Sequence, residues 1–327
     1  MSSVLVTGGT GFLGSHLTRR LLSERFKVNI LARPDSNYSV LELLGARVVH
    51  GDVTDMESVA KAVSGVDTVY HVAAVFRKAR FPDSVYWAVN YDGTMNVMRA
   101  CQKAGVKRII HCSSVGVHGH LDILPSDETA PYKAKDIYQQ TKCAAEKDVL
   151  KLYETEGLPV TVIRPVGIYG PGDTRWLKLY RSISRGRFAM IGSGKTHIHL
   201  VYVSDLLDVF RLAADNPNAV GQVYIGGGER YISLNEYAQI IADTEGVALS
   251  RMHIPLGPVR FLSGVCEDVC RAIGVEPPIY RRRVSFFTND RGFSIEKAKK
   301  ELGYVPKVDV DEGVQRTIAW YLEEGLI

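Results

Sequence analysis

The chain has 327 residues, of which 46% are hydrophobic and 23% are charged. This balance is typical of a globular protein with a large core, and the length suits one large or two smaller domains. The net charge of +4 is small and scattered, which excludes the basic surface of a nucleic-acid-binding protein, and no apolar run approaches the roughly 20 residues needed to span a bilayer.

A glycine-rich turn follows the first predicted strand. Residues 4–7 are a short apolar run typical of a buried strand, and residues 16–22 predict a helix with one apolar face. Gly8, Gly11 and Gly14 lie between them. In a dinucleotide-binding fold, such glycines permit a sharp turn, a close approach of the backbone to a pyrophosphate, and packing of helix on strand. The helix N-terminus then presents free amides to the phosphates, so the pattern predicts a dinucleotide site rather than an ordinary turn.

The end of the second predicted strand, residues 27–31, bears on the choice of cofactor. An acidic residue there would bind a ribose 2′-hydroxyl, whereas an arginine accommodates a 2′-phosphate. Ala32 stands where the acid would fall, and Arg33 follows it. The sequence therefore favours NADP over NAD. Arg33 stacked on the adenine would leave NAD as an alternative, and Asp35 is a weaker candidate for a ribose contact.

Strands and helices continue to alternate through the first half of the chain. The further predicted strands are residues 47–50, 67–71, 107–112 and 160–164. The further predicted helices are residues 56–63, 84–104 and 136–156, and residues 118–135 are predicted to form a loop. Continuously apolar strands that alternate with helices predict an α/β fold built on a doubly wound parallel sheet.

Tyr138 and Lys142 lie four residues apart on a predicted helix, so they share one face. A phenol with a pKa near ~10 is a poor acid–base catalyst at neutral pH, but a nearby ammonium favours the phenolate and lowers that pKa. A hydroxyl after strand 107–112 would polarise a substrate carbonyl, and Ser114 is placed for that role. A tyrosine and a lysine at this spacing are usually a surface pair. Together with the serine and the glycine turn, they predict a redox active site.

The five cysteines, an odd number, bear on metal binding and on location. No matching cluster of histidine or cysteine accompanies them, so no metal site is predicted. We interpret them as reduced thiols of a cytoplasmic protein.

From end to end the sequence resembles the extended short-chain dehydrogenase/reductases. The motifs that carry the resemblance are Thr7-Gly8-Gly9-Thr10-Gly11-Phe12-Leu13-Gly14, Gly51-Asp52, His71-Val72-Ala73-Ala74, Asn90, Ser113-Ser114, Tyr138 with Lys142, Arg164-Pro165 and Tyr169-Gly170-Pro171. The resemblance implies a Rossmann domain with a seven-stranded sheet and a smaller C-terminal α/β substrate domain. The first is expected to comprise residues 1–165 and 198–226, and the second residues 166–197 and 227–327.

The resemblance also implies roles for individual residues. Tyr138 is expected to be the acid–base residue, Lys142 the ribose anchor and Asn90 a supporting residue. Ser114 is expected to be the polarising hydroxyl, with Ser113 as the runner-up. The expected cofactor-binding residues are Gly8, Thr10, Gly11, Phe12, Leu13, Gly14, Arg33, Asp52, Val53, Ala73, Ala74, Ser113, Tyr138, Lys142 and Pro165. Members commonly dimerise through the two long helices, so a homodimer is expected.

The C-terminal part bears on the reaction. Nucleotide-sugar enzymes of this family usually carry an arginine for the diphosphate where this chain has Ile198, which cannot make a bidentate contact. Lys195 or Arg187 would be the substitute in a nucleotide-sugar epimerase. The stretches after residue 254 are similar to those of 3β-hydroxysteroid dehydrogenases, sterol-4α-carboxylate 3-dehydrogenases and dihydroflavonol-reductase-like proteins. The first two groups act on apolar substrates.

An amphipathic helix is predicted over residues 257–275. Its apolar residues recur at spacings of three and four: Phe261, Leu262, Val265, Val269 and Ile273. Packing on the domain core is the favoured interpretation. The alternative is a helix that covers a lipid-like ligand or makes a peripheral contact with a membrane surface.

The sequence therefore predicts an NADP(H)-preferring oxidoreductase that interconverts a secondary alcohol and a ketone on a bulky apolar substrate, such as a 3β-hydroxysterol or triterpenoid. The candidates to line its pocket are Trp87, Trp176, Tyr180 and Phe188, and Arg281–Arg283 are candidates to hold a substrate carboxylate. The alternatives are a nucleotide-sugar epimerase or dehydratase and a non-catalytic dinucleotide-sensing regulator. A regulator is disfavoured because it has no need of the serine, the tyrosine and the lysine.

Overall fold

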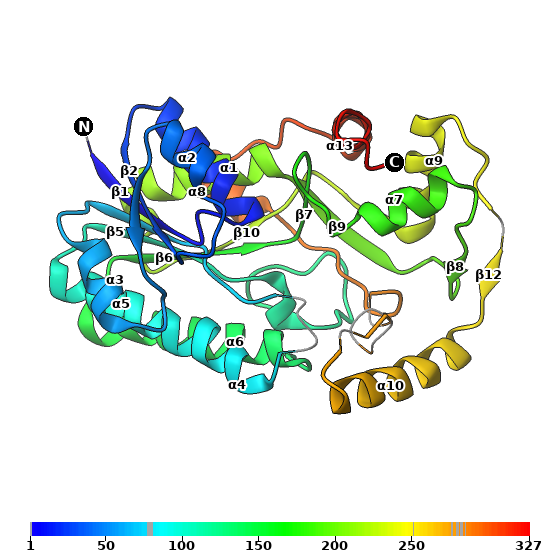
Figure 1. The fold of residues 1–327 in the computed structure, drawn as a ribbon, viewed down its shortest axis with the longest axis horizontal. Helices are drawn as coiled ribbons and strands as arrows, with labels where there is room; N and C mark the ends of the chain where they lie inside the picture. The colour runs from blue at the N-terminus through cyan, green and yellow to red at the C-terminus, as the bar shows by residue number, and fades with distance from the viewer. Residues whose placement is uncertain are drawn as a thin grey trace.

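A seven-stranded parallel sheet forms the centre of the N-terminal part of the fold (Figure 1). The computed structural model describes residues 2–76, 81–250, 252–275, 277–278, 281, 284 and 286–327. The strands of the sheet are β1 (Ser3–Thr7), β2 (Lys27–Ala32), β3 (Arg47–His50), β4 (Thr68–His71), β5 (Arg108–Cys112), β6 (Val160–Pro165) and β10 (Val223–Gly226). Their order is β10-β6-β5-β4-β1-β2-β3, and every neighbouring pair is parallel. The strand order reverses between β1 and β4, which is where ligands bind in such sheets.

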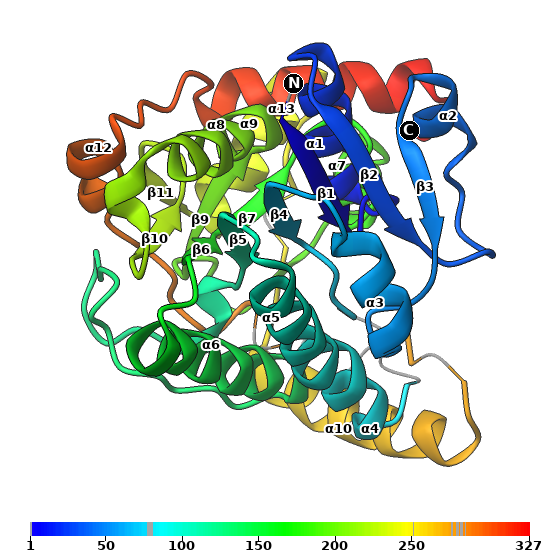
Figure 2. The ribbon, with the colours of Figure 1, turned by 90° about the vertical axis from the view of Figure 1, so that its left-hand side faces the viewer.

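Helices cover both faces of this sheet (Figure 2). One face carries α1 (Phe12–Ser23) and α8 (Val203–Asp215), and the other carries α3 (Met56–Val63), α5 (Gly93–Ala104) and α6 (Ile137–Glu156). Three shorter helical segments connect elements: α2 (Ser39–Leu43) and the 3₁₀ turns Val115–His118 and Pro217–Ala219. The predicted doubly wound α/β fold is therefore confirmed.

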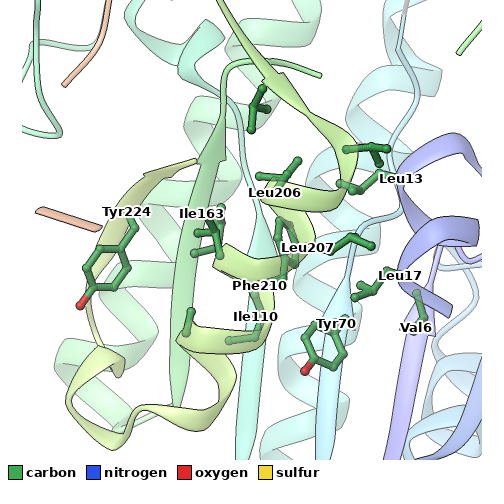
Figure 3. Packing of buried hydrophobic residues seen from close by; sticks show 14 of the residues in the cluster. Val6, Leu13, Leu17, Tyr70, Ile110, Ile163, Leu206, Leu207, Phe210 and Tyr224 are labelled. Atoms are coloured by element: carbon green, nitrogen blue, oxygen red, sulfur yellow. The ribbon is translucent and has the colours of Figure 1, made fainter. Parts of the chain in front are cut away.

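Leucines and aromatic residues hold α1 and α8 on the sheet (Figure 3). Leu17 of α1 and Phe210 of α8 are completely buried, in one cluster with Val6, Tyr70 and Ile110 from the strands. Burying a side chain of this size contributes about 1.5–3 kcal/mol. The continuously apolar strands predicted from the sequence are therefore explained by burial on both faces.

The long helix predicted over residues 84–104 follows that course, but with an irregular turn inside it. It consists of α4 (Asp83–Tyr86), a π-helical turn (Trp87–Asp92) and α5. Such a turn inserts an extra residue and is frequent at functional sites. Asn90 lies in this turn, and its carbonyl accepts a hydrogen bond from Thr94 Oγ1 at 2.7 Å.

A smaller C-terminal unit packs beside the large sheet. Its strands are β7 (Gly167–Tyr169), β8 (Met190–Ile191), β9 (His197–Tyr202), β11 (Tyr231–Ser233) and β12 (His253–Ile254). Its helices are α7 (Leu177–Ser184), α9 (Leu234–Glu245), α10 (Leu256–Ala272) and α13 (Val310–Glu323), whereas α12 (Glu296–Leu302) packs on α8 and β10 of the large sheet. β9 pairs parallel with β7 and antiparallel with β11, and β8 pairs parallel with β12. The residue boundaries between the two domains stay a prediction.

Tyrosines dominate the core of this smaller unit. Tyr180, Tyr237 and Tyr321 are completely buried, and the hydroxyls of Tyr180 and Tyr237 lie 2.9 Å apart. The Tyr321 hydroxyl donates a hydrogen bond to the Asp173 carbonyl at 2.6 Å. A buried phenol needs such a partner, because an unpaired polar group costs stability.

Helix α10 does not pack its apolar residues on the domain core, so the favoured interpretation of this helix is wrong. Its five predicted apolar residues are 48–72% exposed. The inward side is formed instead by small and polar residues, of which Ser263 is completely buried. The physical reason is that the amphipathic pattern specifies a helix with two unlike faces but not which face meets the protein. No helix within the described part of the chain is long and apolar enough to cross a bilayer.

Candidate active site

The glycine turn lies at the carboxyl end of β1. Gly8 has a φ of +71°, and a Cβ there would lie 2.7 Å from the Ala73 backbone nitrogen. A Cβ on Gly14 would lie 2.0 Å from the Gly8 carbonyl oxygen. Gly11 is the N-cap of α1, and no side chain caps the first amides of the helix. Uncapped amides and a side-chain-free cradle fit the pyrophosphate of a dinucleotide.

The other predicted residues of the turn differ in whether their side chains or only their backbone atoms can contact a cofactor. The Leu13 side chain lies in the core, so only its backbone faces the turn. The Phe12 ring contacts the His16 ring edge-on at 5.3 Å, and the Arg175 guanidinium lies 5.0 Å from its centroid. Thr10 is half-buried at the tip of the turn. Backbone contacts therefore dominate this part of the site.

The predicted adenosine-binding residues follow β2 and β3. Arg33 Nε lies 3.4 Å from Asp35 Oδ1, and both side chains are largely exposed. Asp52 Oδ1 accepts hydrogen bonds from the backbone nitrogen of Thr54 at 2.9 Å and from its hydroxyl at 2.8 Å, next to the buried Val53. The Arg33 guanidinium is thus in an exposed pair at the surface, where a phosphate can reach it.

A buried hydrogen-bonded chain joins the ends of β1 and β4. Thr7 Oγ1 lies 2.8 Å from His71 Nδ1 and 3.4 Å from the Ala73 nitrogen that donates to it. His71 Nε2 lies 2.9 Å from Thr94 Oγ1. Since the Thr94 hydroxyl already donates to a carbonyl, it accepts from Nε2–H, and the ring is neutral. Burial, followed by the charge of Lys142, lowers the pKa of His71 to about 3, in agreement with this assignment.

Asn90 fixes the segment after β4 to helix α6. Its Oδ1 accepts from the Val75 backbone nitrogen at 2.8 Å, and its Nδ2 donates to the Val75 carbonyl and the Thr141 hydroxyl, each at 3.2 Å. The Thr141 hydroxyl in turn lies 3.0 Å from the Tyr138 carbonyl. Asn90 thus connects residues 72–76, where Ala73 and Ala74 lie, with the turn of α6 that carries Tyr138 and Lys142.

A capping box places Tyr138 in the first turn of α6. Asp136 Oδ1 accepts from the Gln139 backbone nitrogen at 2.9 Å, and Gln139 Oε1 accepts from the Asp136 backbone nitrogen at 3.4 Å. This arrangement satisfies two amides at the helix start. The Tyr138 ring is largely buried and meets the Phe76 ring edge-on at 4.8 Å.

Lys142 is buried one helical turn after Tyr138 in α6. Its Nζ donates to the Cys112 carbonyl at the end of β5, at 2.5 Å. Burial lowers the pKa of Lys142, and the nearby Cys112 and Glu146 oppose that shift. Tyr138 and Lys142 both lie within α6 (Ile137–Glu156), four residues apart. The prediction that they share one helix face is therefore confirmed.

The two serines after β5 occupy different surroundings. Ser113 is buried and donates a hydrogen bond to the carboxylate of Glu146. Ser114 caps the following 3₁₀ turn by accepting from the Gly116 nitrogen at 3.0 Å, and it lines the same cavity as Tyr138. This placement favours Ser114 over Ser113 as the hydroxyl that meets a substrate.

An ion pair is buried behind these residues. Glu146 accepts from Arg164 Nε at 3.0 Å, and both side chains are almost completely buried. The Tyr132 hydroxyl donates to Glu146 Oε1 at 2.7 Å and accepts from Arg164 at 2.9 Å. Arg164 also donates to the Glu128 carbonyl at 2.8 Å. The pair therefore joins α6, β6 and the loop between residues 118 and 135.

The cavity that Ser114 and Tyr138 line has a volume of about 510 Å³. Aromatic residues form much of its wall: Phe76, Trp176, Phe188, Tyr237, Phe286 and Phe287. Pro165, at the end of β6, also lines it. Three cations border it, Arg175, Lys178 and Arg291, and among the residues described around it none is acidic. Such a wall suits a large apolar ligand that carries an anionic group.

Two of the four aromatic candidates line this cavity. Trp176 and Phe188 do so, whereas Tyr180 is a core residue and Trp87 lies on the π-helical turn against Tyr91, at a ring distance of 5.6 Å. Trp87 is 39% exposed. Core packing and surface placement thus account for the other two.

The positions that the sequence suggested for binding an anionic group do not all lie at the cavity. Ile198 is buried in the cavity wall, whereas Lys195 and Arg187 are exposed and are not among its lining residues. Arg281 pairs with Asp268, at 2.6 Å, instead of facing the cavity. Arg282 and Arg283 lie outside the described residues.

Sequence reasoning missed Thr141, Glu146 and the cavity cations. Glu146 had a signal, since it follows Lys142 at helix spacing and therefore lies on the same face. Arg291 lies more than 100 residues after Arg175 and Lys178 in the chain, so only the tertiary structure brings it to the same cavity as those two.

Comparisons with known proteins agree with this fold. Residues 4–227 match the NAD dependent epimerase/dehydratase family. The chain is 32% identical to a 3 beta-hydroxysteroid dehydrogenase/Delta 5-->4-isomerase of Mycobacterium tuberculosis, over 98% of this chain and 91% of the relative. It is also 32% identical to a decarboxylating sterol-4-alpha-carboxylate 3-dehydrogenase of Schizosaccharomyces pombe, over 98% and 97%. The crystal structure of gox2253 superposes with a TM-score of 0.84 and 33% identity, over 100% of both chains.

A Rossmann sheet with a glycine turn at its switch point and a tyrosine–lysine helix beside it defines an NAD(P)-dependent dehydrogenase or epimerase. The chain belongs to the NAD dependent epimerase/dehydratase family, within the extended short-chain dehydrogenase/reductases. NAD(P) is the cofactor typical of that family.

Proposed function

We propose that the protein is an NADP(H)-preferring dehydrogenase that interconverts a secondary alcohol and a ketone on a bulky apolar substrate, such as a 3β-hydroxysterol or triterpenoid. The observation that carries the proposal is the shared cavity of Ser114 and Tyr138, which is walled by aromatic side chains. The two relatives named above act on such substrates by their names.

Each residue of the site has a separate task in the proposed reaction. Tyr138, as the phenolate, takes the proton of the alcohol. Ser114 donates a hydrogen bond to the substrate oxygen, which stabilises the charge that develops there. Lys142 favours the phenolate of Tyr138 and bonds the cofactor ribose, while Asn90 holds the backbone around both. When bound, the nicotinamide supplies hydride transfer at the carbinol carbon.

The three cations of the cavity support a substrate that carries a carboxylate. Arg175 is held by Asp173 at 2.8 Å, whereas Lys178 lies exposed in the first turn of α7. If the carboxylate is on the carbon next to the carbinol, oxidation forms a β-keto acid. Such an acid loses carbon dioxide without further catalysis: the bond to the carboxyl carbon breaks, and its electron pair forms an enol that becomes the ketone.

Arg33 is the proposed selector of NADP. An Arg33→Asp variant is expected to lose about ten- to a hundredfold in kcat/KM for NADP relative to NAD, because it repels the 2′-phosphate and offers an acceptor to a 2′-hydroxyl. The measurement is the ratio of kcat/KM for the two cofactors. Arg47→Asp is the matched control, because Arg47 is exposed at the amino end of the neighbouring strand β3, whereas Arg33 follows the carboxyl end of β2. An unchanged ratio in the Arg33 variant would remove Arg33 as the selector.

A nucleotide-sugar epimerase is the second candidate, and the cavity cations are the observation that favours it. Arg175 and Lys178 are also suited to a diphosphate. Two observations argue against it: Ile198 is in the cavity wall, and Lys195 and Arg187 are not among the residues that line the cavity. An epimerase returns the cofactor to its starting oxidation state, whereas a dehydrogenase does not.

A paired assay on the purified protein separates these two functions. One arm offers 3β-hydroxysterols, with and without a 4α-carboxylate, in detergent with NADP or NAD and measures reduced cofactor. The other arm offers UDP-sugars and searches for an epimerised product by chromatography. Net reduced cofactor with a sterol supports the proposal, and an epimerised sugar without net reduction contradicts it.

The cellular compartment and the oligomeric state of the enzyme are also part of the proposal. All five cysteines are unpaired, which supports a reducing, cytoplasmic compartment. The homodimer through α4–α5 and α6 stays a prediction.

A further inference from the structure

One side of helix α10 is apolar and open to solvent. We call it the apolar stripe of α10; it consists of Phe261, Leu262, Val265, Val269 and Ile273, which are 72%, 59%, 48%, 54% and 66% exposed. At 3.6 residues per turn, the four that lie within the helix fall in an arc of about 100°. A protein that leaves a continuous stripe of this kind exposed usually covers it with a partner or a membrane.

The opposite side of α10 is the side attached to the protein. Ser263 is completely buried, and the Arg281 backbone nitrogen donates to Glu267 Oε2 at 2.9 Å. Arg281 also pairs with Asp268 at the border of the two sides. The helix lies along one edge of the molecule in both views (Figures 1 and 2). The stripe is therefore a surface feature and not a displaced part of the core.

The sequence of the segment that contains α10 indicates what would cover the stripe. Residues 251–283 contain six arginines and three acidic residues, a net charge of +3, whereas the whole chain carries only +4. A positive segment with an apolar helical stripe is complementary to a bilayer surface that contains anionic lipids. A neutral apolar surface on a second protein would lack the negative charge that complements this segment.

The chain also connects α10 to the substrate cavity at both ends. Before the helix, β12 pairs with β8, and Met190 of β8 lines the cavity. After the helix, Phe286 and Phe287 line it as well. A bilayer contact through α10 would therefore hold the cavity beside the phase in which an apolar substrate dissolves.

We propose that the apolar stripe of α10 docks on the surface of a bilayer that contains anionic lipids. The docking rests on the exposure of the stripe and on the positive charge of the sequence segment 251–283 that contains the helix. Its purpose, to give the cavity access to substrate in the membrane, rests on the proposed function.

Flotation of the full-length protein with vesicles tests the docking. One vesicle population is phosphatidylcholine, and the other also contains about 30% phosphatidylglycerol, which supplies the negative surface charge. We expect the protein to float with the second population, to float at least about tenfold less with the first, and to lose flotation as salt is raised. The absence of flotation with phosphatidylglycerol vesicles overturns the proposal.

A pair of matched variants assigns the contact to the stripe. Phe261→Glu/Val265→Glu places two charges in the stripe and is expected to reduce flotation at least about tenfold. Leu43→Glu/Leu322→Glu makes the same change in charge on α2 and α13, at residues 86% and 61% exposed, and is expected to float like the unchanged protein. All four positions are exposed, so both variants should fold. Equal flotation of the two variants overturns the assignment to α10.

Two controls distinguish membrane docking from a dimer interface at the stripe and from an error in the proposed substrate. If the stripe variant changes a dimer into a monomer in light scattering while no form floats, the stripe is an interface between copies and the proposal fails. Turnover of a detergent-dispersed 3β-hydroxysterol is measured on the same samples, and the stripe variant should retain it. Flotation without sterol turnover leaves the docking intact and overturns the proposed substrate instead.

Discussion

Replacement of Tyr138 by phenylalanine is expected to lower kcat by about 10²–10⁴-fold while cofactor binding changes little. The variant keeps the ring that packs against Phe76 at 4.8 Å, so the cavity wall persists. It loses only the hydroxyl that exchanges a proton with the substrate, and a positioned acid–base residue supplies a factor of this size. The measurement combines steady-state turnover with titration of the cofactor.

Tyr153→Phe is the matched control for this prediction. Tyr153 lies on the same helix, α6, and its ring packs near Gly221, away from the lining of the cavity. We expect its turnover to equal that of the unchanged protein. Substantial activity in the Tyr138 variant would refute the role of Tyr138, and an equal loss in both variants would indicate damage to α6 rather than loss of an acid–base group.

Glu146→Gln is expected to be the most destabilising single change in the site, with a loss of about 3–5 kcal/mol in the free energy of unfolding. The substitution preserves shape but removes the only carboxylate that the structure shows bonded to Arg164, whose guanidinium is almost completely buried. A buried charge left without its partner costs this much. The Tyr132 and Ser113 hydroxyls also lose their charged acceptor. Urea unfolding at equilibrium measures the effect.

Glu156→Gln provides the comparison, because it removes an exposed carboxylate from the same helix. Glu156 accepts from Arg99 at 2.7 Å, and side-chain exposure is 36% for the glutamate and 48% for the arginine. Surface pairs contribute little, so we expect almost no change in the urea midpoint. Similar midpoints for the two variants would contradict the view that the Glu146–Arg164 pair holds α6, β6 and the loop together.

The elements that the sequence predicted well are those whose signals are local. The apolar strands, the glycine turn and the face shared by Tyr138 and Lys142 depend on residues within one or two turns of chain, and the structure has all of them. The parallel sheet follows because a right-handed crossover leaves few topologies for alternating strands and helices.

Features that depend on distant contacts could not be predicted in the same way. Ser113 and Ser114 are neighbours in sequence, and their surroundings differ only because Glu146 from α6 lies beside Ser113. The cations Arg175 and Arg291 meet at one cavity from segments more than 100 residues apart. For α10, the periodicity predicted the helix correctly, but the orientation of its apolar side was decided by packing that no local pattern encodes.

Deuterium placed on the carbinol carbon of a 3β-hydroxysterol tests whether the enzyme transfers the hydrogen of that carbon to the cofactor. Single-turnover reaction with NADP is followed by mass spectrometry of the released cofactor and the steroid. We expect one deuterium in the reduced cofactor and a steroid ketone without it, since the hydride leaves that carbon as Tyr138 takes the proton. Deuterium that stays on the steroid, or a cofactor that is released oxidised while a UDP-sugar is epimerised under the same conditions, would contradict it.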